Sequence, residues 1–394
     1  MNWFRLDNLP LALCAIPFVY YAIAVFSSWQ FFRRPRRPLN GFTPPVSLLK
    51  PIKGVDAGAY ENFASFCRLD YPDYEILFCI DEDDLESAAI LGRLQSDFPQ
   101  RRIRVLLGEP GNGSNDKVMK LAQLVDEAAH EIVVISDSDV KARPDYLRHV
   151  VAPMEDPAMG AASCLYVSND EQTISENLQT VGMISDFYAG ILVARQLDGV
   201  KFALGPTIVT TRSRLAEFGG YSAIDNQPGD DLLVGRLIAE RGHKVDLLPY
   251  AIDTVADYQS FSGLVHKRLR WFVVMRKMRP WGHVGLVFTQ GLAWSLLAVA
   301  LRPTAVVAAA FLGTYLALRV AMTWVIGIYG LRQRSLWAKL PLIPLWDALA
   351  CSIWAFSFLR STIRWRGGDY HIRRGQLVPV NPAAPGVPVG VKAD

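Results

Sequence analysis

The stretch that decides the fold is Ile132-Val133-Val134-Ile135-Ser136-Asp137-Ser138-Asp139, in which a run of apolar residues ends at two acidic side chains. A short, β-branched apolar run of this kind predicts a strand that is buried on both faces. In open α/β sheets, ligands bind beyond the carboxyl ends of the strands. Two carboxylates spaced two positions apart at such an end can share one hard cation, which in turn neutralises a diphosphate.

Outward from this stretch, strand-like and helical patterns alternate along the chain. Strands are predicted at Val46–Pro51, Tyr74–Ile80 and Arg102–Leu107. The helical patterns between them cover about Tyr60–Arg68, Leu85–Phe98 and Asp116–Glu131. This alternation is typical of βαβ units, so we expect an α/β fold with a mixed, mostly parallel sheet flanked by helices and a Rossmann-like nucleotide-binding half.

Further acidic residues also stand at the ends of predicted strands or helices. The cluster Asp81-Glu82-Asp83-Asp84 follows the strand at Tyr74–Ile80, and Gly229-Asp230-Asp231 opens an amphipathic helix predicted at Leu232–Arg241. An acidic loop that only solvates a turn is the alternative for a single strand-end cluster, but two of them in one βαβ array, Asp81–Asp84 and Asp137–Asp139, favour a binding site. Helix capping explains one acid of Asp230-Asp231, and the second is a candidate general base.

Between these clusters lies the loop Gly111–Lys117, which precedes a predicted helix. Its backbone N–H groups and Lys117 are candidates for a phosphate, and Asn115 for a base edge, while a solvated capping turn is the alternative. The loop lacks the GxxxxGK[ST] pattern, so a kinase or ATPase is not indicated.

Composition excludes several classes of protein. Of 394 residues, 51% are hydrophobic and 20% charged, and the apolar residues are bunched as in membrane proteins. A net charge of +3 is too small to indicate a nucleic-acid partner. The 5 cysteines form no CxxC pair, so we expect neither a disulfide framework nor a zinc site, and a soluble part that faces a reducing compartment.

The N-terminal apolar segment, Leu11–Phe32, is long enough to cross a bilayer. The cluster Arg33–Arg37 follows it, which places its C-terminal side in the cytoplasm. A cleaved signal peptide would carry its basic residues before the apolar run and a small-residue cleavage site after it, so an uncleaved anchor is the favoured interpretation.

Near the C-terminus, candidate membrane segments lie at about His283–Leu301, Thr304–Ile328 and Leu340–Leu359, and a basic tail follows. If all of them span, that tail falls on the side opposite the acidic clusters, against the positive-inside bias. We therefore expect one segment, His283–Leu301, to be re-entrant or interfacial. The end of the chain, Asn381–Asp394, has a composition that predicts disorder.

The segment His266–Trp281 is basic, aromatic and amphipathic, which predicts a helix at the lipid headgroup level. It contains Lys267-Arg268-Leu269-Arg270-Trp271. Together with Asp81/Asp83, Asp137-Ser138-Asp139 and Asp230-Asp231, in that order, this motif resembles the D, D, D, (Q/R)xxRW signature of family 2-like glycosyltransferases.

Within that superfamily the chain is most similar to the ceramide glucosyltransferase branch, family 21. The stretches that carry this closer resemblance are Leu48–Gly54, Glu61–Phe63, Asp70–Pro72 and Ile363–Gly367. Hopanoid sugar transferases share much of the pattern, so ceramide, a hopanoid or diacylglycerol stays open as the acceptor.

The resemblance implies a GT-A fold and a set of roles. Asp81, or less securely Asp83, would contact the uridine of a UDP-sugar, and Lys117 would lie close to the nucleotide. Asp137 and Asp139 would hold Mg²⁺ or Mn²⁺ at the diphosphate. Asp231, with Asp230 beside it, would be the catalytic base. Lys267, Arg270 and Trp271 would contact the diphosphate and the acceptor. Lys267 stands where the family has glutamine or arginine, and lysine lacks the planar guanidinium fork of arginine.

The expected organisation is a membrane anchor over residues 1–37, a cytosolic GT-A domain over 44–281, membrane segments over 282–360, and a basic, then disordered tail over 361–394. The expected enzyme is an inverting hexosyltransferase of a bacterial inner membrane, which transfers a sugar from a UDP-sugar to a lipid hydroxyl group. UDP-glucose is the preferred candidate for the donor and ceramide for the acceptor. A processive polysaccharide synthase is the third alternative, but it would need more spanning helices to line a channel.

Overall fold

The computed structural model describes residues 9–35, 41–56, 58–109, 114–169, 171–255, 260–365, 368–373 and 375–380. The predictions for the glycines of the loop at 111–113 and for the tail from residue 381 lie outside these residues.

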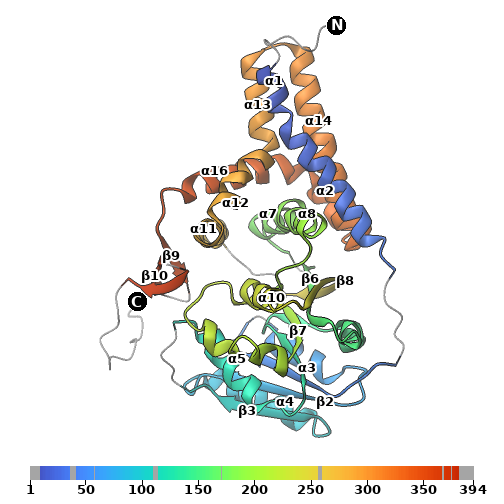
Figure 1. Ribbon diagram of the computed structural model, residues 1–394, viewed down its shortest axis with the longest axis vertical. Helices are drawn as coiled ribbons and strands as arrows, with labels where there is room; N and C mark the ends of the chain where they lie inside the picture. Colours follow the sequence, from blue (N-terminus) through green and yellow to red (C-terminus); the bar gives the residue numbers. More distant parts are fainter. Residues whose placement is uncertain are drawn as a thin grey trace.

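A mixed sheet forms the centre of the lower body in Figure 1, with strand order β3-β2-β1-β4-β7-β6-β8-β5. Its first half, β3-β2-β1-β4, is parallel throughout, and β7 then pairs antiparallel with both β4 and β6. The strands are β1 (Val46–Pro51), β2 (Tyr74–Ile80), β3 (Arg102–Leu107), β4 (Ile132–Ser136), β5 (Val140–Lys141), β6 (Met159–Ser168), β7 (Thr207–Thr211) and β8 (Lys244–Thr254). This topology confirms the predicted fold class.

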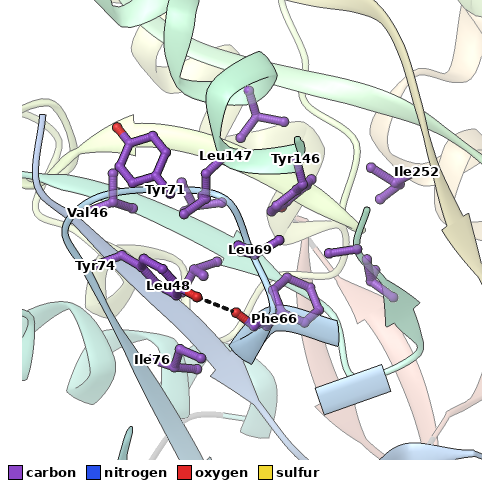
Figure 2. Packing of buried hydrophobic residues seen from close by; sticks show 14 of the residues in the cluster. Val46, Leu48, Phe66, Leu69, Tyr71, Tyr74, Ile76, Tyr146, Leu147 and Ile252 are labelled. Atoms are coloured by element: carbon purple, nitrogen blue, oxygen red, sulfur yellow. Dashed lines mark hydrogen bonds between the residues drawn. The ribbon is translucent and has the colours of Figure 1, made fainter. Parts of the chain in front are cut away.

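Helices cover both faces of this sheet because its central strands are apolar on both sides. Val46 and Leu48 of β1 pack into one core and Leu49 into the other. The first face is covered by α3 (Ala59–Cys67), α4 (Leu85–Asp97) and α6 (Tyr146–Val151), and the second by α5 (Asp116–Glu127), α9 (Arg212–Ala216) and α10 (Asp230–Glu240). Figure 2 shows the first core, where the Tyr74 hydroxyl donates to the Phe66 carbonyl oxygen at 2.9 Å.

The helix predicted over Asp116–Glu131 ends earlier, at Glu127. Ala128 is extended (φ −66°, ψ 129°), and the next two backbone N–H groups turn toward buried side chains. The N–H of Ala129 donates to Glu75 Oε1 at 2.7 Å, and that of His130 donates to Ser47 Oγ at 3.1 Å. These two bonds replace the helical ones and lead the chain directly into β4.

A layer of helices joins the sheet to the apolar bundle at the top of Figure 1. It contains α7 (Ile174–Gly182), the π-helical turn η3 (Met183–Phe187), α8 (Tyr188–Asp198), α11 (Phe261–Met278) and α12 (Pro280–Gly285). One continuous hydrophobic core links α7, η3 and α8 to the membrane-length helices. The sheet and the bundle are therefore packed to each other through this layer.

In the described part of the chain, three helical segments are long and apolar enough to cross a membrane: Leu9–Phe32, Ala305–Gly330 and Leu336–Ser357. They comprise α1 (Leu9–Cys14) with α2 (Ile16–Phe32), α14 (Ala305–Thr323) with η6 (Trp324–Gly330), and α15 (Leu336–Lys339) with η7 (Leu340–Leu342) and α16 (Ile343–Ser357).

The segment expected to be re-entrant is bent. Pro280–Thr289, which ends in η5 (Leu286–Thr289), meets α13 (Gly291–Leu301) at 55°, as a broken span or a re-entrant loop would. In Figure 1, α16 lies between α13 and α11, and it packs against both and against α7. Which segment leaves the membrane therefore stays a prediction.

After α16 the chain returns toward the sheet and forms a small antiparallel sheet, β11-β10-β9. Its strands are β9 (Thr362–Trp365), β10 (Gly368–Arg373) and β11 (Gln376–Pro379). Ile363, Ile372 and Leu377 bury against Val273 of α11.

The contact between α10 and the segment before β7 generates a test of the packing. A Cβ atom on Gly235 would lie 2.3 Å from the backbone carbonyl carbon of Phe202, so Gly235→Ala must displace one of the two backbones. We expect a loss of about 1–3 kcal/mol in unfolding free energy. The matched control is Gly92→Ala in α4, where a Cβ meets nothing within 4 Å and stability should rise by about 0.5–1 kcal/mol. Thermal unfolding in detergent measures both, and an unchanged Gly235→Ala variant would contradict the close approach.

Candidate active site

Two carboxylates converge at the end of β4. A Cβ atom placed on Gly205 would lie 3.3 Å from Asp231 Oδ2 and 3.5 Å from Asp137 Oδ2. Asp137 follows β4, and Asp231 stands in the first turn of α10. Gly205, with only a hydrogen in place of that Cβ, leaves the room in which the two side chains meet.

Backbone hydrogen bonds fix the Asp231 carboxylate. The N–H of Gly205 donates to Oδ2 at 3.0 Å, and the N–H of Leu232 donates to Oδ1 at 2.8 Å. Burial and, after it, the charge of Asp230 together raise the pKa of Asp231 to about 6, while Lys117 opposes the shift. A held carboxyl group with this pKa is suited to accept a proton near neutral pH.

Lys117, in the first turn of α5, supplies local positive charge. Its Nζ lies 2.5 Å from Asp137 Oδ1 and 3.7 Å from Asp230 Oδ2. Burial disfavours the charged amine, but these carboxylates outweigh burial and raise the pKa of Lys117. The lysine therefore stays protonated and bridges the end of β4 to α10.

Asp139 is half-buried, and one of its two carboxylate oxygens, Oδ1, is buried and unused. Its Oδ1 has no hydrogen-bond partner among the described residues. Burial raises the pKa of Asp139 to about 7, with further contributions from the charges of Asp137 and Asp56, whereas Lys50 and Lys267 lower it. An unpaired buried carboxylate oxygen close to a second carboxylate is the donor chemistry that a hard divalent cation requires. No cluster of three or more candidate ligands occurs in the described part of the chain, so protein ligands alone do not complete such a site.

The acidic residues that follow β2 make different contacts. Asp81 Oδ1 lies 2.6 Å from Nζ of Lys120, and that amine also donates to the carbonyl oxygen of Ile52 at 2.7 Å. Asp84 caps α4 by accepting from the N–H of Ser87 at 3.0 Å. Asp83 is exposed, and within the described residues its carboxylate makes no hydrogen bond or ion pair. Lys120 thus fixes the Asp81 carboxylate, whereas Asp83 stays at the surface.

Asn115, proposed from the sequence as a base-edge contact, is buried and holds the backbone instead. Its side-chain amide donates to the carbonyl oxygen of Gln227 at 3.1 Å, and its N–H donates to that of Asp225 at 2.8 Å. The N–H of Leu377 in β11 donates to the carbonyl oxygen of Asn226 at 2.7 Å. The loop before α10 is therefore held by both the start of α5 and the C-terminal sheet.

Helix α11 carries the basic-aromatic motif over the site. The charge of Lys267 on this helix lowers the pKa of Asp139. The Trp271 ring lies 5.7 Å from the ring of Phe187 in η3. Arg270 is half-buried on the same helix. These three residues are the ones that the sequence singled out.

Sequence reasoning missed three buried cations around the site. Lys50 donates from Nζ to the carbonyl oxygen of Asp137 at 2.9 Å, and burial lowers its pKa to about 7. Lys120 is the partner of Asp81. Arg268 lies 4.9 Å from the Trp271 ring and 4.7 Å from that of Trp346. Lys50 directly follows the strand-like run Val46–Leu49. A charged residue at that position was the sequence signal from which a buried cation could have been predicted.

Comparison with known sequences places the chain among glycosyltransferases. The sequence profile of Glycosyl transferase family 21 matches residues 9–378. Ceramide glucosyltransferase 3 of Caenorhabditis elegans is 24% identical over 352 residues, which are 85% of this chain and 74% of the relative. Ceramide glucosyltransferase 1 of the same organism is 26% identical over 62% of this chain and 54% of the relative.

A second kind of relative carries a different lipid in its name. Beta-monoglucosyldiacylglycerol synthase of Trichormus variabilis is 25% identical over 61% of this chain and 51% of its own length, so the match spans about half of that protein. Among solved structures, the mannosyltransferase PcManGT from Pyrobaculum calidifontis, in complex with GDP-Man and Mn²⁺, has a TM-score of 0.56 at 19% identity. The alignment covers 87% of this chain and 99% of that one, which shows a shared GT-A fold.

Proposed function

Because this chain belongs to glycosyl transferase family 21, we propose that it transfers a sugar from a UDP-sugar to a hydroxyl group of a membrane lipid. UDP-glucose is the proposed donor and ceramide the proposed acceptor. The observation that carries the proposal is the convergence of Asp137 and Asp231 at Gly205, next to the half-buried Asp139. Such a site can hold a nucleotide diphosphate on one side and activate a hydroxyl group on the other.

Asp231 is the proposed base. A lipid hydroxyl is a poor nucleophile until its proton has an acceptor, and the Asp231 carboxylate is already oriented by two backbone N–H groups. The hydroxyl would attack the anomeric carbon from the face opposite the UDP group. A single displacement inverts the configuration, so an α-linked donor yields a β-glycoside. Asp230 supports the base by its negative charge, which favours proton uptake at Asp231.

Asp137 and Asp139 would hold Mg²⁺ or Mn²⁺. The buried, unpaired Oδ1 of Asp139 fits such an ion, and the ion would supply positive charge that neutralises the donor diphosphate. The chain's own cations add to that charge. Lys117 and Lys267 act on these carboxylates, and Arg270 stands one helical turn from Lys267 on α11.

The donor's base would be bound near Asp81. Lys120 orients the Asp81 carboxylate, because it is held in turn by the carbonyl oxygen of Ile52. This assignment makes Asp81, rather than the exposed Asp83, the residue that contacts the uridine.

A lipid acceptor is supported by the packing of the site against apolar helices. Trp271, next to the proposed diphosphate contacts, packs on η3, and η3 shares its core with the membrane-length segments. The proposed orientation sets the catalytic part on the cytoplasmic face, where Arg33 and Arg34 follow α2. The acceptor hydroxyl would then reach Asp231 while its acyl chains stay in the bilayer.

The base assignment is tested with Asp231→Asn, which removes the proton acceptor but keeps the shape of the side chain. We expect kcat for transfer to fall by about 10²–10⁴-fold, the contribution of a positioned base. Titration calorimetry with UDP should give a Kd close to that of the wild type. Asp198→Asn is the matched control, because among the described residues Asp198 forms an ion pair only with Lys201, at the surface. Equal losses of transfer and of UDP binding in Asp231→Asn would instead identify Asp231 as a nucleotide-binding or structural residue.

The metal assignment predicts that chelation by EDTA abolishes transfer and that added Mg²⁺ or Mn²⁺ restores it. Asp139→Asn should weaken UDP binding in the presence of the ion, because one charged ligand is lost. Asp70→Asn serves as the control, since Asp70 pairs with Arg148 at the surface. Full transfer activity after exhaustive chelation would rule out the ion.

A further inference from the structure

The loop that precedes the proposed base takes its shape from residues that are distant in the sequence. It runs from Asp225 to Gly229, between η4 (Tyr221–Ile224) and α10, lies wholly in the described part of the chain, and contains no helix or strand. The main-chain carbonyl groups of such a loop need donors from elsewhere, because an unpaired buried carbonyl is costly. Three successive carbonyl groups of this loop accept hydrogen bonds from other segments.

The start of α5 supplies two of these donors. The N–H of Asn115 donates to the carbonyl oxygen of Asp225 at 2.8 Å, and the Asn115 side chain donates to that of Gln227 at 3.1 Å. The N–H of Ser114 adds a bond of 2.9 Å to Oδ1 of Asn226. The same helix carries the two lysines that pair with the acids at the ends of β2 and β4. The loop before the base is therefore bonded to the segment proposed to face the donor.

The C-terminal sheet supplies the remaining donor. The N–H of Leu377 donates to the carbonyl oxygen of Asn226 at 2.7 Å. Since β11 is an edge strand, this N–H lies on the edge that β10 does not cover. The Leu377 side chain is buried beside Val273 of α11. The end of α11 also reaches the loop, because a Cβ atom on Gly229 would lie 3.7 Å from Met278 Sδ. The small sheet and α11 thus approach the loop together.

The stretch Ile363–Gly367 helps to build this support. It carries part of the resemblance to family 21, but the proposed mechanism gives it no role. Its described residues belong to β9, which packs on α11, and Ile363 is buried in the same small core as Leu377. The stretch therefore belongs to the body from which β11 reaches the loop.

Asn226 is the residue at which the two supports meet. Its Oδ1 accepts from the start of α5, its main-chain carbonyl accepts from β11, and its Nδ2 donates to Asp225 Oδ1 at 2.8 Å. From Asn226 the chain passes through Pro228, whose ring restricts the backbone, into the first turn of α10. That turn carries Asp231. A displacement of Asn226 would therefore be passed on to the carboxylate.

We propose that Asn226 is a positioning residue for the base and that β11 supports it through the N–H of Leu377. The inference rests on the proposed role of Asp231. Without the bond from β11 the loop is held from the α5 side alone, so the Asp231 carboxylate is less often within reach of the proton that it accepts. The effect falls on the chemical step, because the lysines of α5 keep their own ion pairs.

The test removes this one N–H group. Leu377→Pro eliminates the donor, and an edge strand accepts proline where the N–H faces away from the neighbouring strand. Pro379, which faces the same edge as Leu377 because alternate residues do, shows that β11 accommodates a proline there. We expect kcat for transfer to fall about 10–100-fold, as a small misplacement of a catalytic group does, with KM for the UDP-sugar unchanged. Asn226→Ala, which removes the acceptor of the Ser114 N–H, should reproduce this loss.

Ile372→Ala is the matched control, because it removes a buried side chain from the same small core and leaves the N–H of Leu377 in place. It should lower the Tm of the detergent-purified protein and keep kcat within about twofold of the wild type. Equal losses of kcat in Ile372→Ala and Leu377→Pro would show that the stability of the sheet, rather than this bond, decides activity, and would overturn the proposal.

Two further measurements separate this inference from the proposed function. In the Asp231→Asn background, Leu377→Pro should lower the residual kcat by less than about twofold, because the base that it positions is already absent. Hydrogen exchange read by mass spectrometry should be faster over residues 225–231 in Leu377→Pro than in the parent, and this readout needs no turnover.

The outcomes differ for the two ideas. If Asp231→Asn is inactive but Leu377→Pro keeps the wild-type kcat, the positioning role is wrong and the proposed function stands. If the parent transfers sugar to no lipid, the proposed function is wrong, and the exchange rates decide whether β11 holds the loop. Unchanged exchange over residues 225–231 in folded Leu377→Pro would overturn the support by β11 in either case.

Discussion

The concentration of negative charge at the end of β4 is the constraint on which the rest of this structure depends. Asp137, Asp139, Asp230 and Asp231 are gathered there, and burial raises the pKa of Asp139 and of Asp231. Lys117 bridges two of them, and Lys50 is held against the backbone of Asp137. The compensation is incomplete, since the pKa of Asp139 is still raised to about 7. A site with this residual negative charge is prepared for a cation and a diphosphate.

The same constraint explains how the two layers of the molecule are joined. Helix α11 brings Lys267 to the carboxylates and, through Trp271 and Arg268, packs against η3 and α16. The C-terminal sheet holds the other side of α11 and the loop before α10. Segments far apart in sequence thus converge on one site beside the membrane-length helices. Under the proposed function, this arrangement would bring a soluble donor and a lipid to the same carboxylates.

The predictable part of the fold was the part in which local sequence determines structure. The strands β1, β2, β3 and β4 have the predicted bounds, because short β-rich runs that alternate with helical patterns indicate parallel strands. The strands β6 and β8 were not predicted, and β6 begins with small residues whose pairing depends on a register shift at Ala161. The helix α5 ended early because Glu75, distant in sequence, takes its next N–H group.

The candidate site also has a part that could be predicted from the sequence and a part that could not. Acids at strand ends and the motif on α11 could be recognised from spacing, since each lies where topology places ligands. The partner of Asp81, Lys120, lies on a different element, α5. No local sequence pattern predicts such long-range partners. They become visible only when the packed helices show which polar groups share a buried space.

The central claim, sugar transfer to a lipid, is tested most directly by mass spectrometry of lipid extracts from cells that are supplied with ceramide and express either the wild-type chain or Asp231→Asn. The account predicts a new hexosyl-ceramide that is present only with the wild type. A new glycosylated hopanoid or diacylglycerol would keep the reaction and change the acceptor. The absence of any new glycolipid, with the protein folded and inserted in the membrane, would contradict the account.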